Sequence, residues 1–352
     1  MEKKILNFWK NKRVLVTGHT GFKGAWMSLI LSQLKSKVIG YSLKPKKEQK
    51  LYKFFNLKKK LYHSTFNDVL DRKKLKKIIN KFRPQIIFHF AAQSLVIDSY
   101  QRPFETVNSN VIGLTNLLEF CNNKYTKSII IVTSDKCYDN SQNYKYFSEN
   151  SRLGGKDIYS SSKACAELIA NSFRKSFYDN RKIATVRAGN VIGGGDFSKN
   201  RIVSDFFKSI YEKKKLIIRN PNHIRPWQHI FDVLNGYMIL AEKIYLNDRK
   251  YSEAWNFGPE KKNNIKVRNL ISKFNKYLKN PVKIKVLKKK NYFEEKKIFL
   301  DSKKSRLKLK WKSKFNIDQT MENIFDWYIN LKNNKNILQK SEAQIDKYFF
   351  NI

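Results

Sequence analysis

The sequence predicts an α/β fold, a doubly wound parallel sheet with a smaller lobe interleaved toward the C-terminus. Through the first half of the chain, short apolar runs alternate with stretches that have apolar residues at helical spacing. That alternation is typical of parallel strands joined by helices on both faces of a sheet. Past about residue 190 the chain has short segments rich in Gly, Asn, Pro and aromatic residues, a composition typical of loops around a ligand.

The individual elements follow from these patterns. Compact apolar runs predict strands at residues 13–17, 38–41, 86–90, 128–132 and 183–187. Apolar residues three or four positions apart predict helices at 26–34, 75–82, 111–120, 234–244 and 319–331. The lysine-rich stretch 44–60 is expected to be a surface loop or a peripheral helix. We expect loops at VIGGGDF (191–197), IIRNPNHIRPWQHI (217–230) and AWNFGP (254–259).

The charge of the chain is strongly basic. Its 352 residues include 72 Lys and Arg against 29 Asp and Glu, a formal net charge of +43. Such a charge can indicate a nucleic-acid-binding protein, because basic surfaces neutralise phosphates. However, 58 of the 72 basic residues are lysines dispersed along the chain, as an AT-rich genome would produce, and no nucleic-acid motif is present. We expect no specific nucleic-acid partner, and nucleic-acid binding remains the alternative from another class.

Composition also predicts the compartment. A hydrophobic fraction of 41% is enough for a core and argues against disorder. No apolar run approaches the roughly 18 residues that a membrane helix needs, and the N-terminal apolar stretch is too short for a signal peptide. Cys121, Cys137 and Cys165 lack the spacing of disulfide or zinc motifs. We therefore expect a cytoplasmic protein with no membrane contact and no metal.

A glycine-rich turn directly follows the first strand. TGHTGFKG (17–24) places Gly18, Gly21 and Gly24 three residues apart between a strand and a helix. Glycine lets the backbone approach a pyrophosphate, whose charge meets the helix N-terminus. The motif predicts a Rossmann-type dinucleotide site. We expect residues 1–189 to form this domain, with part of 230–258 returning to it, and residues 190–352 to form mainly the substrate lobe.

The residues at the end of the second strand do not decide whether the cofactor is NAD or NADP. It ends in Gly40-Tyr41-Ser42-Leu43-Lys44, without the acid that would hold the ribose of NAD. Asp68 is a candidate for holding the adenine and equally a candidate helix N-cap.

A second motif suggests acid–base chemistry. Tyr159 and Lys163 are four residues apart, on one face of a helix. A lysine ammonium beside the tyrosine would favour the phenolate, so we expect Tyr159 to be a usable base near neutral pH. Ser134 follows the strand 128–132 and offers a hydroxyl for the same substrate oxygen.

Asp135 and Lys136 come next, at the carboxyl end of that strand, where such folds bind ligands. An ordinary turn is the alternative explanation for the aspartate. A simple dehydrogenase needs only Ser, Tyr and Lys, so this pair favours an additional proton-transfer step.

Together these motifs resemble the extended short-chain dehydrogenases/reductases and, among them, the CDP-glucose 4,6-dehydratases. The matching segments are TGHTGFKG (17–24), HFAAQSLV (89–96), VNSNVIGLTNLLE (107–119), TSDKCY (133–138), YSSSKACAE (159–167), RAGNVIGGGDF (187–197), NRIVSDF (200–206), IIRNPNHIRPWQHI (217–230) and AWNFGP (254–259). The TSDK and RPWQH segments are the most diagnostic. The chain departs from the family at Phe293-Glu294, where the family usually has His-Glu, and at Asp232, where it tends to have Glu.

The resemblance implies a lyase that uses tightly bound NAD and converts CDP-glucose to CDP-4-keto-6-deoxyglucose and water, for deoxysugar biosynthesis of the surface-polysaccharide or O-antigen type. Tyr159 would remove the 4-OH proton while C4 passes a hydride to the nicotinamide. Lys136 would then remove the C5 proton, and Asp135 would protonate the departing C6 hydroxyl. The hydride would return to C6, and C5 would be reprotonated.

The resemblance also implies binding residues. The cofactor would contact Gly18, Thr20, Gly21, Phe22, Gly24, Ser42, Asp68, Val69, Ala91, Ala92, Tyr159 and Lys163. The substrate would contact Gln93, Asn190, Arg201, Arg219, Arg225 and His229. Arg225 suits the pyrophosphate because a guanidinium binds it bidentately. Surface solvation explains Arg201 and Arg219 equally well, and a structural hydrogen bond explains His229 equally well. His19 and His89 are expected to be structural.

Such enzymes self-associate through helices like 108–120 and 163–178, which implies a homodimer or tetramer. The nearest alternatives are a 4-epimerase and a 4,6-dehydratase for another nucleotide sugar. The choice of nucleotide stays open because no residue by itself identifies cytosine.

Overall fold

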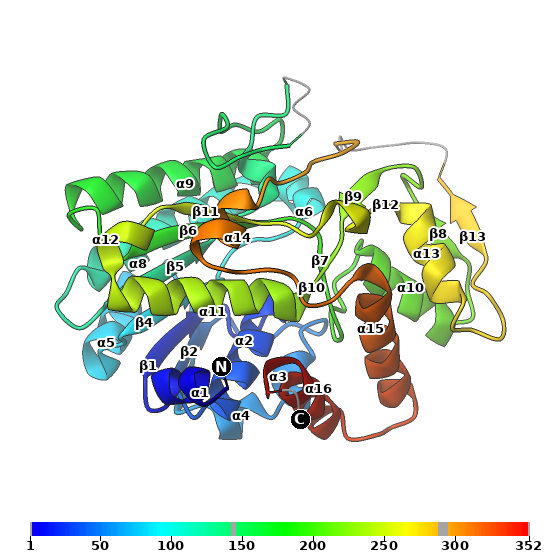
Figure 1. Cartoon of the computed structure of the whole chain (residues 1–352), viewed down its shortest axis with the longest axis horizontal. Coiled ribbons are helices and arrows are strands. Elements are labelled where there is room, and N and C mark those ends of the chain that lie inside the picture. The colour runs from blue at the N-terminus through cyan, green and yellow to red at the C-terminus, as the bar shows by residue number, and fades with distance from the viewer. Residues whose placement is uncertain (1, 142–145, 288–294, 351–352) are drawn as a thin grey trace.

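A seven-stranded parallel sheet forms the centre of the molecule (Figure 1). The computed structural model describes residues 2–141, 146–287 and 295–350, so Phe293 and Glu294 lie outside the described residues. The strand order is β11-β6-β5-β4-β1-β2-β3. Their bounds are β1 (Arg13–Thr17), β2 (Lys37–Ser42), β3 (His63–Phe66), β4 (Ile86–His89), β5 (Ser128–Val132), β6 (Ile183–Ala188) and β11 (Ala254–Phe257). The predicted fold class is confirmed.

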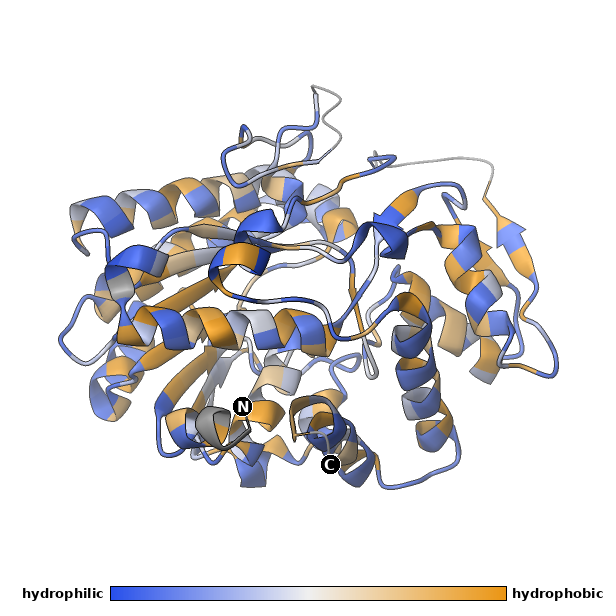
Figure 2. Ribbon diagram, viewed as in Figure 1, coloured by the Kyte–Doolittle hydropathy of each residue, from blue (hydrophilic) through white to orange (hydrophobic). Residues whose placement is uncertain are grey.

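Helices cover both faces of this sheet because its strands are apolar on both sides. Val14 and Val16 of β1 face one hydrophobic cluster and Leu15 faces the other. The first cluster includes α1 (Glu2–Trp9), α2 (Phe22–Gln33) and α11 (Ile230–Leu246). The second includes α5 (Arg72–Phe82), α8 (Gly113–Cys121) and α9 (Ile158–Ser176). Figure 2 shows hydrophobic residues along the strands of the sheet and on the helices that cover it.

The remaining helices and short strands lie outside the central sheet. In the first half they are α3 (Leu51–Phe54), α4 (Leu57–Lys60), α6 (Val96–Gln101), α7 (Pro103–Val107), the π-helical turn η1 (Asn108–Ile112) and the 3-10 turn η2 (Asp135–Cys137). In the second half the helical ones are α10 (Ile202–Tyr211), α12 (Asp248–Tyr251), η3 (Lys261–Asn263), α13 (Val267–Asn275), α14 (Lys303–Lys308), α15 (Ile317–Lys332) and α16 (Ile337–Phe350). The short strands pair as β10 (Gln228–His229) with β7 (Val191–Ile192), β12 (Asn264–Lys266) with β9 (Ile224–Pro226), and β13 (Ile284–Val286) with β8 (Leu216–Ile218).

The five predicted strands are confirmed to within a residue at each end. The helix predicted at 26–34 begins earlier, at Phe22, because the glycine turn leads straight into it. The stretch 44–60 contains the peripheral helices α3 and α4. The predictions at 75–82, 111–120, 234–244 and 319–331 fall largely within α5, η1 with α8, α11 and α15.

The predicted loops past residue 190 were partly wrong. AWNFGP begins with β11, a strand that pairs with β6 at the edge of the main sheet. The segments 191–197 and 217–230 contain β7, β8, β9 and β10. Strands of two to four residues are too short to show an alternating pattern, so composition alone suggested loops.

The last helix, α16, ties the end of the chain to the first half. Lys60 forms an ion pair with Glu342 at 2.6 Å. The Tyr348 hydroxyl donates a hydrogen bond to the buried Asp232 carboxylate at 2.6 Å, and the Lys314 backbone N–H donates to the same oxygen at 2.7 Å. Both halves of the chain thus share one hydrophobic cluster. The domain boundary at residues 189 and 190 stays a prediction.

The buried Asp232 makes stability depend on pH. Burial raises its pKa from 3.8 to about 6. The unfolded chain releases this proton near pH 4 and the folded chain only near pH 6, so stability falls as pH rises through that window. Between pH 4 and 7 we expect the free energy of unfolding of the wild type, measured with urea, to fall by about 2–3 kcal/mol relative to that of Asp232→Asn. Glu322→Gln, at an exposed site on α15, is the control, and equal pH profiles for wild type and Asp232→Asn would contradict the assignment.

Candidate active site

The glycine-rich turn between β1 and α2 forms a cradle for a diphosphate. Gly18 has φ +73°, and a Cβ there would lie 2.8 Å from the backbone nitrogen of Ala91. A Cβ at Gly24 would lie 2.1 Å from the Gly18 carbonyl oxygen. The turn closes only with glycine at both positions. Gly21 is the N-cap of α2, so Phe22 begins the helix and first-turn N–H groups are available to an anion.

The far side of the cradle is held by hydroxyl and imidazole contacts. The hydroxyls of Thr20 and Ser42 are hydrogen-bonded at 2.8 Å, at the end of β2. The His19 ring fills the space over Gly40 and pairs with Ser64 at 2.8 Å. Burial lowers the pKa of His19 to about 4, so the ring is neutral at pH 7. His19 is structural, as predicted.

Asp68 does not cap a helix. Asp71 caps α5 and accepts from the Lys74 N–H at 2.9 Å, so the N-cap alternative for Asp68 is wrong. The Asp68 carbonyl accepts from the Tyr41 hydroxyl at 2.8 Å, close to the end of β2. The neighbouring Val69 is buried, and its carbonyl accepts from Asn116 at 3.1 Å.

The residues after β4 lie beside the cradle. Ala91 donates its N–H to the Thr17 hydroxyl at 3.3 Å, and Ala91, Ala92 and Gln93 are half-buried. The Gln93 side-chain amide makes hydrogen bonds to both backbone groups of Leu95, at 2.7 and 2.9 Å. Its polar atoms therefore already stabilise their own turn. His89 of β4 pairs with the Thr17 hydroxyl at 2.8 Å, and burial lowers its pKa to about 3, which confirms it as a structural residue.

Ser134, Asp135 and Tyr159 form one cluster of interacting side chains at the carboxyl end of β5. The Ser134 hydroxyl donates to the Asp135 carboxylate at 3.0 Å and accepts from the Lys136 N–H at 3.2 Å, which caps η2. Ser134 is also close enough to Tyr159, in the first turn of α9, to lower the pKa of the Tyr159 hydroxyl. All three side chains are buried. The structure therefore joins two motifs that lie some 25 residues apart in the sequence.

Burial dominates the electrostatics of this cluster. It raises the pKa of Asp135, although Lys136 and the Ser134 hydrogen bond act in the opposite direction. It raises the pKa of Tyr159 to about 12 and lowers the pKa of Lys163 to about 8. Lys163 is not among the groups that shift the pKa of Tyr159, where burial dominates, and the role of Tyr159 as a base stays a prediction. The Lys163 ammonium instead donates to the Val132 carbonyl at 3.2 Å.

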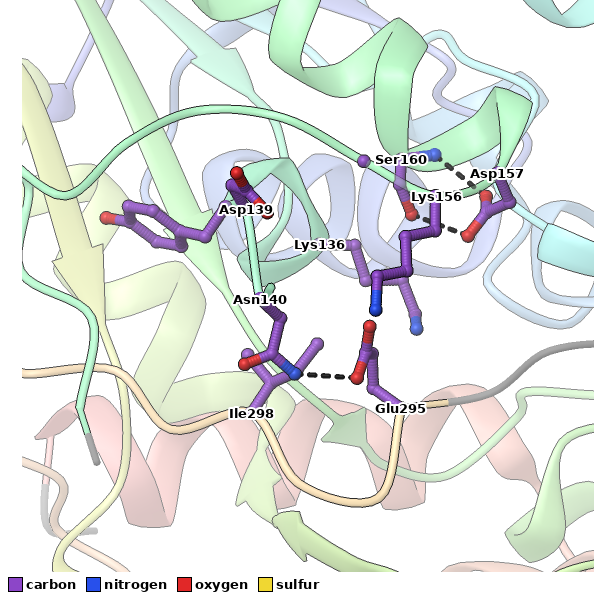
Figure 3. Close-up of a pocket in the computed structure, with 10 residues that line it drawn as sticks. Lys136, Asp139, Asn140, Lys156, Asp157, Ser160, Glu295 and Ile298 are labelled. Atoms are coloured by element: carbon purple, nitrogen blue, oxygen red, sulfur yellow. Dashed lines mark hydrogen bonds between the residues drawn. The ribbon is translucent and has the colours of Figure 1, made fainter. Parts of the chain in front are cut away.

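Lys136 lies next to this cluster and lines a recess. The recess is also lined by Lys156 and Glu295 (Figure 3). Asn140 donates to the Glu295 carboxylate at 2.6 Å on the wall of that recess. Lys136 is close enough to Asp135 to lower the pKa of its carboxyl.

A buried ion pair beneath the cluster was missed from the sequence. Glu167 of α9 pairs with Arg187 of β6 at 2.7 Å. Its carboxylate also accepts from the hydroxyls of Thr133 at 2.5 Å and Thr185 at 2.6 Å. The Arg187 guanidinium donates to the Tyr138 hydroxyl at 2.7 Å. A charged residue in the apolar run IATVRA was the signal for such a pair.

Two of the three predicted substrate arginines lie near the cluster. Arg225 of β9 lowers the pKa of Asp135 and Arg201 lowers that of Tyr159. Arg201 also forms an ion pair with Asp196 at 3.5 Å. Arg219 acts electrostatically on Asp205 and donates to Asn200 at 3.3 Å. Asn190 is half-buried after β6, and its carbonyl accepts from the Gln228 N–H at 3.1 Å.

The structure favours a structural role for His229. Its ring is buried against Phe231 and Phe315, caps α11 and accepts from the Phe231 N–H at 3.2 Å. Burial lowers its pKa to about 3. Among the described residues, no group of three or more His, Cys, Asp or Glu is placed to hold a metal ion. Within the same residues, no helix is long and apolar enough to span a membrane.

Comparisons with known proteins agree with this geometry. A relative named CDP-glucose 4,6-dehydratase, from Salmonella typhimurium, is 39% identical over 350 residues, which cover 97% of each chain. Among solved structures, an epimerase from Methanothermobacter thermautotrophicus superposes with a TM-score of 0.81 at 19% identity, covering 94% of this chain and 96% of its own. A dTDP-glucose 4,6-dehydratase from Bacillus anthracis, in complex with NAD, superposes with a TM-score of 0.76 at 20% identity, covering 93% and 99%.

The family model that matches spans nearly the whole chain. It is described as GDP-mannose 4,6 dehydratase and matches residues 15–324, from β1 into α15. This range includes the glycine cradle, the Ser134–Asp135–Tyr159 cluster and the arginines of the second half. The chain therefore belongs to the GDP-mannose 4,6-dehydratase family.

Proposed function

We propose that the protein is an NAD-dependent 4,6-dehydratase that converts CDP-glucose to CDP-4-keto-6-deoxyglucose and water. The observation that carries the proposal is the cluster of buried Ser134, Asp135 and Tyr159 side chains at the end of β5. The relative that is 39% identical over nearly the full length supports the choice of reaction and of nucleotide. The proposal includes a cytoplasmic location, which agrees with three cysteines that form no disulfide.

The described residues fit NAD. Gly18 and Gly24 let the turn close tightly where a Cβ would clash with backbone, so the N-terminus of α2 begins directly at the turn, as a diphosphate site requires. Ser42 and Asp68 lie at the end of β2, where such folds place the adenosine half. When bound, NAD supplies a hydride acceptor for C4, a hydride donor for C6 and a positively charged ring.

Each residue of the cluster has a distinct task. Tyr159 takes the 4-OH proton, with Ser134 holding the same oxygen. Its high pKa in the protein alone means that this step depends on positive charge brought close to the phenol. Lys136 takes the C5 proton, which requires its flexible side chain to turn from the recess beside Glu295. Asp135 gives its proton to the departing C6 hydroxyl, and its raised pKa favours the protonated form that this step needs.

The position of Asp135 separates a dehydratase from an epimerase. An epimerase only oxidises and reduces C4, so it needs a base and a hydroxyl donor but no acid at C6. Here a buried carboxyl is hydrogen-bonded to the same serine that contacts Tyr159. The cluster therefore contains one more proton donor than epimerisation requires.

The proposed reaction can be tested directly. The purified protein is incubated in turn with CDP-, UDP-, dTDP- and GDP-glucose, and products are identified by mass spectrometry. We expect a product lighter by one water and carrying a 4-keto group, formed fastest from CDP-glucose. Faster turnover of another nucleotide would contradict the base assignment, and a 4-epimer of unchanged mass would contradict the reaction.

Asp135→Asn should separate oxidation from water loss. The variant keeps Ser134 and Tyr159 but cannot protonate the leaving hydroxyl, so we expect dehydration to slow by about 10²–10⁴-fold. Reduced nicotinamide should accumulate on adding CDP-glucose, which its absorbance reports. Asp179→Asn, at an exposed site past the end of α9, is the matched control. Dehydration by Asp135→Asn at near the wild-type rate would rule Asp135 out as the acid.

The proposal extends to self-association through α7, η1 and α9. These elements pack against one another and expose several large apolar side chains. The most exposed are Phe104 of α7 at 75%, Phe177 after α9 at 60% and Leu168 of α9 at 55%. Apolar side chains gathered on one surface are typical of a protein interface, and a second copy of the chain would bury them symmetrically.

Replacing Leu168 by lysine should weaken this association. A charge in the centre of a symmetric apolar interface is repeated in the partner, so the two lysines repel each other. We expect Leu168→Lys to shift the mass measured by light scattering from dimer or tetramer toward monomer. The control is Leu246→Lys on α11, which is 66% exposed and remote from these helices along the chain. A wild type that is already monomeric would refute the interface.

A further inference from the structure

Lys23 lies where the glycine cradle meets the second half of the chain. It is the second residue of α2, and its neighbours on that helix contact the turn 193–195. A Cβ at Gly193 would lie 3.2 Å from the Phe22 ring, and the Trp26 indole donates to the Gly194 carbonyl at 2.9 Å. The first turn of α2 is therefore fixed against the loop that continues to Asp196.

The surroundings of Lys23 contain excess positive charge. Lys163, Arg201, Asp135 and Asp196 all act on its ammonium electrostatically. Asp196 is already paired with Arg201 at 3.5 Å, and Asp135 accepts from Ser134. Among the described residues, Lys23 itself makes no hydrogen bond and no ion pair. Two further cations thus act on Lys23, while one of the two carboxylates that act on it is paired with Arg201 and the other accepts a hydrogen bond from Ser134.

This arrangement is unfavourable for the protein alone. A cation in the first turn of a helix opposes the positive end of the helix dipole. Although Lys23 keeps some accessible surface, protein surrounds its ammonium, and burial together with Arg201 and Lys163 lowers its pKa to about 7. An anion placed beside Lys23 would offset all three effects.

Two anions could lie here, and the neighbours of Lys23 distinguish them. The diphosphate of a dinucleotide is met by the backbone N–H groups of the cradle, which need no side chain. The charges around Lys23 instead belong to the reaction centre, Asp135 and Lys163, and to the second half of the chain, Asp196 and Arg201. We propose that Lys23 binds the diphosphate of the nucleotide sugar together with Arg201, so that the glycine-rich motif serves substrate as well as cofactor. This inference rests on the proposed function above.

The test compares nucleotide affinity with cofactor content. Calorimetric titration with CDP, UDP, dTDP and GDP identifies the nucleoside diphosphate that the wild type binds best, and that nucleotide is the probe for all variants. We expect Lys23→Met to weaken its binding about 10–100-fold, the usual loss for one charge-assisted contact. Lys23→Arg should retain most of the affinity. The NAD content per chain, measured after heat release, should stay at the wild-type level in both variants.

Controls separate this role from general charge and from folding. Lys73→Met removes the same charge from an exposed position on α5 and should leave affinity unchanged. Lys23→Gln provides a second neutral variant besides Lys23→Met. Neither variant should have a lower melting temperature than the wild type, because each removes a buried charge. Unchanged nucleotide affinity in Lys23→Met, loss of NAD with affinity retained, or an equal effect of Lys73→Met would each overturn the inference.

The same titration distinguishes the inference from the proposed function. If the wild type binds another nucleotide better than CDP, the base assignment fails, while the ratio between Lys23→Met and wild type still decides the role of Lys23. A wild type that binds none of the four nucleotides would overturn both.

Discussion

The buried ion pair between Glu167 and Arg187 sets the geometry on which the active site depends. Glu167 lies on α9, eight residues after Tyr159 and four after Lys163, so all three share one helix. Its carboxylate binds Thr133 at the end of β5 and Thr185 and Arg187 in β6. Tyr159 can reach Ser134 only because α9 is fixed to these strands. Breaking such a pair leaves an uncompensated buried charge, which typically costs about 3–5 kcal/mol.

The rest of the molecule is arranged around this fixed unit. The segment 295–301 packs against η2, since Ile298 and Leu300 share a hydrophobic cluster with Cys137 and Tyr138. The cradle and the turn 193–195 meet at α2, where Trp26 donates to Gly194. The end of the chain returns to the same core through Tyr348 and Asp232. One continuous core therefore supports the cofactor site, the proton-transfer groups and the arginines.

Local sequence patterns predicted the sheet well because its strands are buried on both faces and read as apolar runs. They failed where strands are very short, as at Val191–Ile192, or where a strand such as Ala254–Phe257 is interrupted by a polar residue. The grouping of Ser134, Asp135 and Tyr159 was predictable from motifs, because each follows a strand or begins a helix at the same edge. The protonation of Tyr159 was not, because it depends on burial that spacing does not show. The partners of Glu167 and the surroundings of Lys23 could not be predicted either, because they are tertiary contacts that spacing along the sequence does not show.

The central claim is that these residues perform an internal oxidation and reduction around the loss of water. The most direct measurement uses CDP-glucose carrying deuterium at C4 and locates the label in the product by NMR. The account predicts deuterium at C6 of the 4-keto-6-deoxy product, because the hydride removed from C4 returns to C6 within the same active site. A product with deuterium at C4, or one whose C6 carries only protium while the label is released, would contradict it.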